Sequence, residues 1–114
     1  LTFKENCPDT RNSKVNDIIK QLNTYGIEPV VVDPWASDRD AMSEYGVTLT
    51  KLEDVKDADC VIVAVAHNEF RDLSLEDIKK LYRDGMDSEK VLLDVKGLYQ
   101  IADLKASGIK YWRL

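Results

Sequence analysis

The sequence has little of what metal-binding, disulfide-rich and membrane proteins need. Its 114 residues include two cysteines, Cys7 and Cys60, and one histidine, His67. These cannot supply the roughly four nitrogen and sulfur ligands of a structural zinc site, nor a disulfide framework. The longest apolar run, residues 61–66, is far shorter than the roughly 20 residues of a membrane helix. We therefore expect a reduced, cytoplasmic protein with no metal ion and no membrane partner.

Positive charge is also scarce. The chain has 16 Lys and Arg against 21 Asp and Glu, a formal net charge of −5. A surface that wraps nucleic acid needs clustered cations, so no nucleic-acid partner is expected. A small anionic ligand stays possible, because a few local cations can dominate one cleft. With 44% hydrophobic and 32% charged residues, the chain is typical of one folded domain over residues 1–114. It starts without Met, and we expect a domain excised from a longer enzyme.

Apolar periodicity alternates between strand and helix spacing along the chain. Strand patterns occupy residues 1–3, 29–33, 60–66, 91–95 and 109–114. Four stretches have helix patterns. The first starts after an N-cap at Asn12 or Ser13 and stops at Gly26, the second covers residues 38–45, the third follows an N-cap at Ser74, and the fourth covers residues 100–106. Residues 47–49 predict a brief extended piece, and residues 52–59 a single helical turn. This order predicts an α/β fold: a doubly wound, Rossmann-like parallel sheet of about five strands with helices on both faces.

Ligands of doubly wound sheets bind outside the carboxyl ends of the strands, so the loops there are the candidate site. The first such loop carries Lys4 and Arg11, with Lys14 one helical turn further on. It contains no glycine, which excludes the usual close approach of a dinucleotide pyrophosphate. Lys96 follows the predicted fourth strand at the same edge. These cations predict an anion site, and the alternative is that they are solvated charges that balance Glu5 and nearby acids.

Three other polar residues follow predicted strands or lie in the first loop. Asp33 could contact a ribose, although a turn role before Pro34 is the simpler interpretation. His67 could be an acid–base group or a structural residue. Cys7 is the one candidate nucleophile, and no partner base lies near it in sequence. A small hydrolase that uses Cys7 and His67 is therefore an alternative, and a stand-alone flavodoxin-like binding or signalling module is another.

The exact amino-acid sequences of four segments are more specific than these patterns. The opening LTFKENCPDTRNSKV, and then VVDPW, CVIVAVAHNEF and LLDVKG, resemble in order and spacing the C-terminal, UDP-binding domain of the UDP-glucose/GDP-mannose dehydrogenase family. They are most similar to bacterial UDP-N-acetyl-D-galactosamine and UDP-N-acetyl-D-mannosamine 6-dehydrogenases. The resemblance implies NAD-dependent oxidation of a sugar 6-hydroxyl to a carboxylate, for the synthesis of surface-polysaccharide precursors.

The resemblance also implies roles for four residues. Phe3 and Lys4 correspond to a pair that contacts the nucleotide-sugar, and Arg11 to an arginine that reaches NAD across a cleft. Lys96 falls where the UDP-glucose branch has a substrate-binding arginine, which favours a different UDP-sugar. No catalytic residue is expected in this chain, and Cys7 does not match the family nucleophile. NAD would be held mainly by an N-terminal domain, and a central region would make the full-length enzyme a homodimer.

Overall fold

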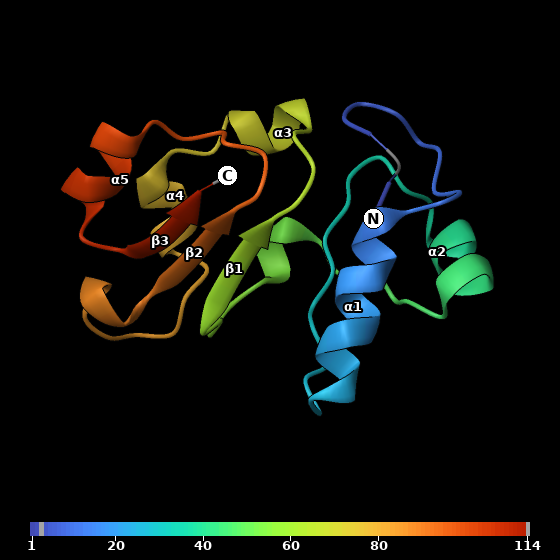
Figure 1. The fold of residues 1–114 in the computed structure, drawn as a ribbon. Coiled ribbons are helices and arrows are strands. Elements are labelled where there is room, and N and C mark those ends of the chain that lie inside the picture. Colours follow the sequence, from blue (N-terminus) through green and yellow to red (C-terminus); the bar gives the residue numbers. More distant parts are fainter. Residues whose placement is uncertain (3, 114) are drawn as a thin grey trace. The chain divides into compact units, whose positions relative to one another are not determined.

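The computed structural model describes residues 1–2 and 4–113, in two compact units. Unit 1 is Leu1–Val55 and unit 2 is Lys56–Leu114 (Figure 1). Each unit has its own cluster of buried apolar side chains. Within the described residues, no helix is both long enough and apolar enough to cross a membrane.

The helices of unit 1 begin and end at the expected capping residues. The described helices are α1 Lys14–Thr24, α2 Asp38–Tyr45 and the single 3-10 turn η1 Leu52–Asp54. Ser13 Oγ accepts a hydrogen bond from the Asn16 N–H at 3.3 Å and so caps α1. Ser37 caps α2 in the same way, through the Asp40 N–H at 3.1 Å. Gly46 ends α2 in the left-handed region, with φ of 65°. The predicted helices that became α1 and α2 are thus confirmed to within about two residues at each end, while the turn predicted over residues 52–59 ends at Asp54.

The two predicted strands of unit 1 are wrong. Residues 29–33 form one isolated parallel bridge, between Val31 and Leu49, rather than a ladder. Pro29 and Pro34 lack the N–H donors that a strand needs at either end of this segment. Leu1 and Thr2 adopt no strand either, and Phe3 lies outside the described residues. The donors at Leu1 and Thr2 bind a side-chain carboxylate instead of a neighbouring strand, as described below.

Unit 2 contains a parallel sheet. Its described elements are β1 Cys60–Val63, α3 Asn68–Arg71, α4 Leu75–Lys79, η2 Asp87–Glu89, β2 Val91–Asp94, α5 Ile101–Ser107 and β3 Lys110–Arg113. The strand order is β1-β2-β3, with Val63 opposite Asp94 and Asp94 opposite Arg113. These three residues therefore form one row at the carboxyl ends of the strands (Figure 1). The α/β class is confirmed, but the described sheet has three strands instead of about five.

Strand order also corrects the expected layering. Ile78 of α4 and Leu104 of α5 belong to the same buried cluster as Val63 and Leu92. Both helices thus cover one face of the sheet, as right-handed crossovers require when strand order follows chain order. A doubly wound sheet reverses its strand order at a switch point. The described sheet has no such reversal. A switch point therefore cannot be used to locate a ligand site, and only the carboxyl ends of the strands indicate where a ligand would bind.

Candidate functional site

The first loop of unit 1 is attached to α2 through both the side chain and the backbone of Thr10 and through the backbone of Ser13. Thr10, which is buried, donates from Oγ1 to Glu44 Oε2 at 2.7 Å. The Tyr45 hydroxyl donates to the Thr10 carbonyl and accepts from the Ser13 N–H at 3.1 Å. These bonds hold the loop next to the beginning of α1. Lys4 and Lys14 are both exposed on it, as expected of cations that meet a ligand in solution.

Arg11 has an acidic partner within the same loop. Its Nε and Nη2 lie 3.0 Å from Asp9 Oδ1 and Oδ2, and its backbone N–H donates to Oδ1 at 2.9 Å. These bonds to the guanidinium, together with its charge, lower the pKa of Asp9 to about 2. The pair orients the arginine, yet it also balances its charge. Arg11 thus has the acidic partner that the solvated-charge interpretation expects, and its contact with a ligand stays a prediction.

Arg11→Ala is expected to raise the pKa of Asp9 from about 2 part of the way to the ordinary value of about 3.9, because the hydrogen bond from the backbone N–H of residue 11 remains. The cause is the loss of two charge-assisted hydrogen bonds. The measurement is an NMR titration of the Asp9 carboxyl carbon in both proteins, with Arg39→Ala as a matched control on the same unit. An unchanged midpoint in Arg11→Ala would show that the pair does not form in solution.

Asp33 has a structural role instead of a ribose contact. It is 6% exposed. Its Oδ2 accepts from the amino nitrogen of Leu1 at 2.8 Å and from the Thr2 N–H at 2.9 Å, and its Oδ1 accepts from the N–H groups of Trp35 and Ala36 at 2.9 and 3.1 Å. Burial raises the pKa of Asp33, but these bonds and the charge on Leu1 outweigh it, so the pKa lies well below its ordinary range. The turn interpretation of Asp33 is confirmed.

His67 is the residue directly before α3, four positions after the end of β1, and is fully buried. Its carbonyl accepts from the Phe70 and Arg71 N–H groups at 2.9 and 3.0 Å, and its ring lies 5.4 Å from the Phe70 ring. A side chain without exposed surface cannot take a proton from a substrate in this conformation. The structural interpretation of His67 is therefore favoured, which weakens the hydrolase alternative. Across residues 1–2 and 4–113, no group of three or more acidic, Cys or His side chains could hold a metal ion.

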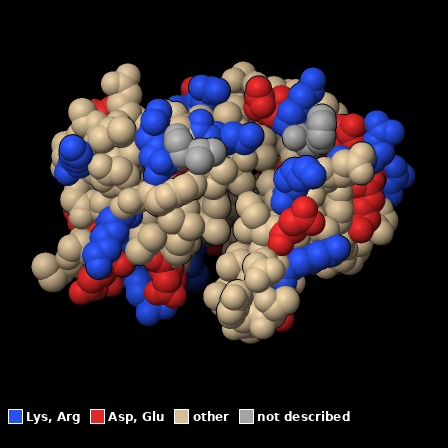
Figure 2. Space-filling view, in the orientation of Figure 1, with Lys and Arg blue, Asp and Glu red and all other residues tan. Residues whose placement is uncertain are grey.

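Lys96 is exposed in a turn directly after β2. The turn begins at Asp94, which is fully buried, and contains Gly97 with φ of 66°. Figure 2 shows a group of Lys and Arg side chains over the end of the sheet near the C-terminus, while other parts of this face mix both charges. The carboxyl edge of unit 2 is thus a basic surface within an acidic chain.

Sequence reasoning missed Asp94 and Arg113, which both contact the Lys96 turn. Asp94 carried one signal: an acidic residue that ends an apolar strand must find donors if it is buried. Arg113 carried no such signal, because strand register, not local sequence, places it beside Asp94.

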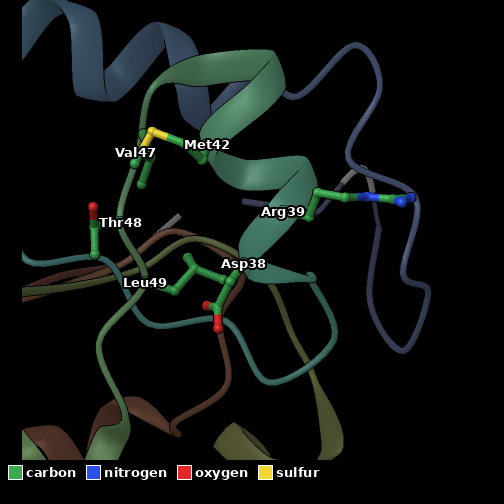
Figure 3. Close-up of a pocket in the computed structure, with 6 residues that line it drawn as sticks. All are labelled: Asp38, Arg39, Met42, Val47, Thr48 and Leu49. Atoms are coloured by element: carbon green, nitrogen blue, oxygen red, sulfur yellow. The ribbon is translucent and has the colours of Figure 1, made fainter.

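A hollow of about 440 Å³ lies elsewhere, on unit 1 (Figure 3). It is lined by Asp38, Arg39, Met42, Val47, Thr48 and Leu49. Met42 and Val47 lie together on one side, and the Arg39 side chain points away from the rest (Figure 3). The remaining charged group is a carboxylate, which would repel an anionic ligand. The hollow therefore does not fit a phosphate.

Comparison with known proteins identifies relatives of this chain. Residues 1–101 match the UDP-binding domain model of the UDP-glucose/GDP-mannose dehydrogenase family. The chain is 49% identical over 98 residues to UDP-N-acetyl-D-glucosamine 6-dehydrogenase of Pseudomonas aeruginosa, which covers 86% of this chain and 22% of that protein. The Salmonella typhi protein of the same name is 38% identical over 98 residues, 84% of this chain and 22% of that protein. Protein CapL of Staphylococcus aureus is 36% identical over 114 residues, 100% of this chain and 26% of that protein. The chain thus spans about a quarter of each relative or less.

Proposed function

Because the chain belongs to the UDP-glucose/GDP-mannose dehydrogenase family, as its UDP-binding domain, we propose that it binds the UDP part of a nucleotide-sugar for an NAD-dependent 6-dehydrogenase. The sugar is a UDP-N-acetylhexosamine, since relatives that are 49% and 38% identical are named for such a substrate. The full-length enzyme would oxidise the sugar 6-hydroxyl to a carboxylate, for surface-polysaccharide precursors. The single observation that carries this proposal is the family match over residues 1–101.

Within this proposal, Phe3, Lys4 and Lys96 contact the nucleotide-sugar. Lys4 and Lys96 are both exposed, and each ammonium offers a point charge with three donors to a phosphate oxygen. A lysine at position 96 cannot bind a phosphate through two parallel hydrogen bonds from one planar group, as an arginine can. It therefore suits a site in which other groups orient the diphosphate. The role of Lys96 is to neutralise charge, and the role of Phe3 is to contact the nucleotide-sugar beside Lys4.

NAD would be held mainly by a separate N-terminal domain. The loop between Lys4 and Ser13 has no glycine, so its backbone cannot take a pyrophosphate at close range. This chain therefore does not fit a dinucleotide crevice of its own, and Arg11 would make one contact from the opposite wall. When bound, NAD accepts the hydride in the complete enzyme, while this chain binds and orients the substrate. We expect the complete enzyme to be a cytoplasmic homodimer, built with a central dimerisation domain.

The proposal is tested by isothermal titration of the 114-residue chain with UDP and with UDP-N-acetylhexosamines. We expect weak binding, with a Kd of about 10 µM to 1 mM, because the chain supplies one wall of a cleft. Lys96→Met should weaken UDP binding about tenfold, which corresponds to one lost charge-assisted contact. Lys105→Met, an exposed lysine on α5, removes the same charge and should leave the Kd unchanged.

Two outcomes would contradict the proposal. Equal Kd values for Lys96→Met and the unsubstituted chain would remove Lys96 from the site. Turnover of a UDP-sugar by this chain alone would mean that it carries catalytic groups of its own. The flavodoxin-like alternative predicts instead that neither UDP nor a UDP-sugar binds at millimolar concentration.

A further inference from the structure

Asp94 contacts the turn that carries Lys96 through two backbone N–H groups of the turn. The two carboxylate oxygens of Asp94 accept separately, Oδ1 from the Leu98 N–H at 2.9 Å and Oδ2 from the Tyr99 N–H at 2.9 Å. Asp94 is fully buried, so these bonds face little competition from water. One side chain thus sets the positions of two consecutive peptide groups just after Lys96.

Arg113 contacts the same turn through two backbone carbonyls. Its Nε donates to the Tyr99 carbonyl at 2.8 Å, and its Nη2 lies 3.4 Å from the Gly97 carbonyl. The parallel register places Arg113 directly opposite Asp94 on the neighbouring strand. Two side chains of one row therefore contact the turn, one through its N–H groups and one through its carbonyls. We call this pair the Asp94–Arg113 clamp.

Glycine suits position 97 in this arrangement, and a side chain there would be strained. The φ of Gly97, 66°, favours glycine. A Cβ at this position would lie 3.1 Å from Arg113 Nη2 and 3.3 Å from Arg113 Cζ. The guanidinium therefore packs directly on the Gly97 backbone.

The far end of the turn is also attached. The Tyr99 hydroxyl donates to the Leu73 carbonyl at 2.9 Å. Burial raises the pKa of Tyr99 to about 12, so the hydroxyl keeps its proton near neutral pH. Between the clamp and this bond, the Lys96 side chain is exposed. Among the described residues of this unit, Asp59, Glu76, Asp77 and Asp87 form ion pairs with Arg83, Lys79, Lys80 and Lys90.

We propose that Asp94 and Arg113 are positioning residues, which set the Lys96 turn so that its ammonium meets a phosphate of the nucleotide-sugar. The inference rests on the proposed function, because it assumes that Lys96 binds the nucleotide. A fixed turn lets a long lysine side chain bind with less loss of conformational freedom. Arg113 acts through the turn, by holding two carbonyls at once, instead of by contacting the phosphate itself.

A double-mutant cycle on the 114-residue chain tests this inference, with UDP as the probe. Arg113→Ala should weaken UDP binding about fivefold. The double variant with Lys96→Met should bind no more weakly than Lys96→Met alone, because Arg113 acts through Lys96. Arg113→Lys keeps the charge but lacks the planar fork whose two nitrogens, Nε and Nη2, contact the two carbonyls, so its Kd should resemble that of Arg113→Ala. Arg83→Ala, at an exposed ion pair with Asp59, is the matched control and should bind UDP as the unsubstituted chain does.

Hydrogen exchange of the Leu98 and Tyr99 amides gives a second, ligand-free measurement. Arg113→Ala should speed exchange at both positions, while Arg83→Ala should not. Full UDP affinity in Arg113→Lys, or losses that multiply in the double variant, would overturn the inference in favour of a direct charge contact. If Lys96→Met weakens UDP binding and Arg113→Ala does not, only the clamp fails. If the unsubstituted chain binds no UDP, the proposed function fails, and the role given to the clamp fails with it.

Discussion

Replacing Asp33 with alanine is expected to lower the free energy of unfolding of unit 1 by about 3–5 kcal/mol. The buried carboxylate accepts from Leu1, Thr2, Trp35 and Ala36. Without it, those donors lose their shared acceptor in a part of the unit that has little access to water. This effect is large because one side chain takes the place of the strand ladder that the sequence pattern predicts here.

Urea unfolding followed by amide NMR signals of unit 1 measures this effect. Glu28→Ala removes an exposed carboxylate and should change the unfolding free energy by less than about 0.5 kcal/mol. The Asp33 pKa is lowered in the folded chain, so the stabilisation is complete above about pH 4 and declines as the pH falls further. The difference between the two proteins should therefore shrink below about pH 4. A loss of stability equal to that of Glu28→Ala would show that the donors find other acceptors.

Replacing Asp94 with alanine is expected to lower the free energy of unfolding of unit 2 by about 2–4 kcal/mol. The substitution leaves the Leu98 and Tyr99 N–H groups without their acceptor and removes most of a fully buried side chain. Asp94→Asn keeps one carbonyl oxygen, so it should lose about half as much. Unlike Arg113→Ala, which removes an exposed side chain, Asp94→Ala should therefore affect folding as well as binding.

Thermal and urea unfolding of unit 2, followed by the Trp112 fluorescence, measures the Asp94 effect. Asp103→Ala, an exposed acid in the first turn of α5, is the control and should cost less than about 1 kcal/mol. Equal losses for Asp94→Asn and Asp94→Ala would mean that a single acceptor contributes nothing. Equal losses for Asp94→Ala and Asp103→Ala would mean that the two amides bind water at no cost.

Local chemistry predicted α4, α5 and the three strands of unit 2, but it did not predict α3 or η2, and β1 ends at Val63 instead of Ala66. Ser13 and Ser74 cap α1 and α4, and Ser74 forms a capping box with Asp77, a position where Glu or Gln is more usual. The apolar runs after Asp59 and after Lys90 became β1 and β2. These signals lie within a few residues of the element that they specify. These local signals can be read without knowing how distant segments of the chain pair.

Pairing between distant segments was harder to predict. The pattern at residues 29–33 is apolar enough for a strand, but Pro29 and Pro34 limit its donors. The Asp33 carboxylate then binds the backbone of Leu1 and Thr2 directly. An alternation of apolar residues cannot reveal that a side chain has replaced a neighbouring strand.

In the candidate site, too, features set by nearby residues were predictable and features set by the pairing of distant segments were not. The order of elements predicted that Lys4 and Lys96 each follow a strand. Lys96 does follow β2, whereas Leu1 and Thr2 before Lys4 form no strand. The pairing of Arg11 with Asp9 was open as an alternative, because the two lie two positions apart. The Asp94–Arg113 clamp depends on strand register, which the sequence alone does not give. The assignment of Lys4, Arg11 and Lys96 to one ligand stays a prediction.

The central proposal is that this chain binds the UDP part of a UDP-sugar, with Lys4 and Lys96 each predicted to contact its diphosphate. Titrating the isotope-labelled 114-residue chain with UDP, and following every backbone amide by NMR, tests it most directly. We predict saturable shifts at Lys4 and at residues 95–99, with smaller shifts when uridine replaces UDP. Saturable shifts confined to the hollow between Asp38 and Leu49, or the same shifts with uridine as with UDP, would contradict it.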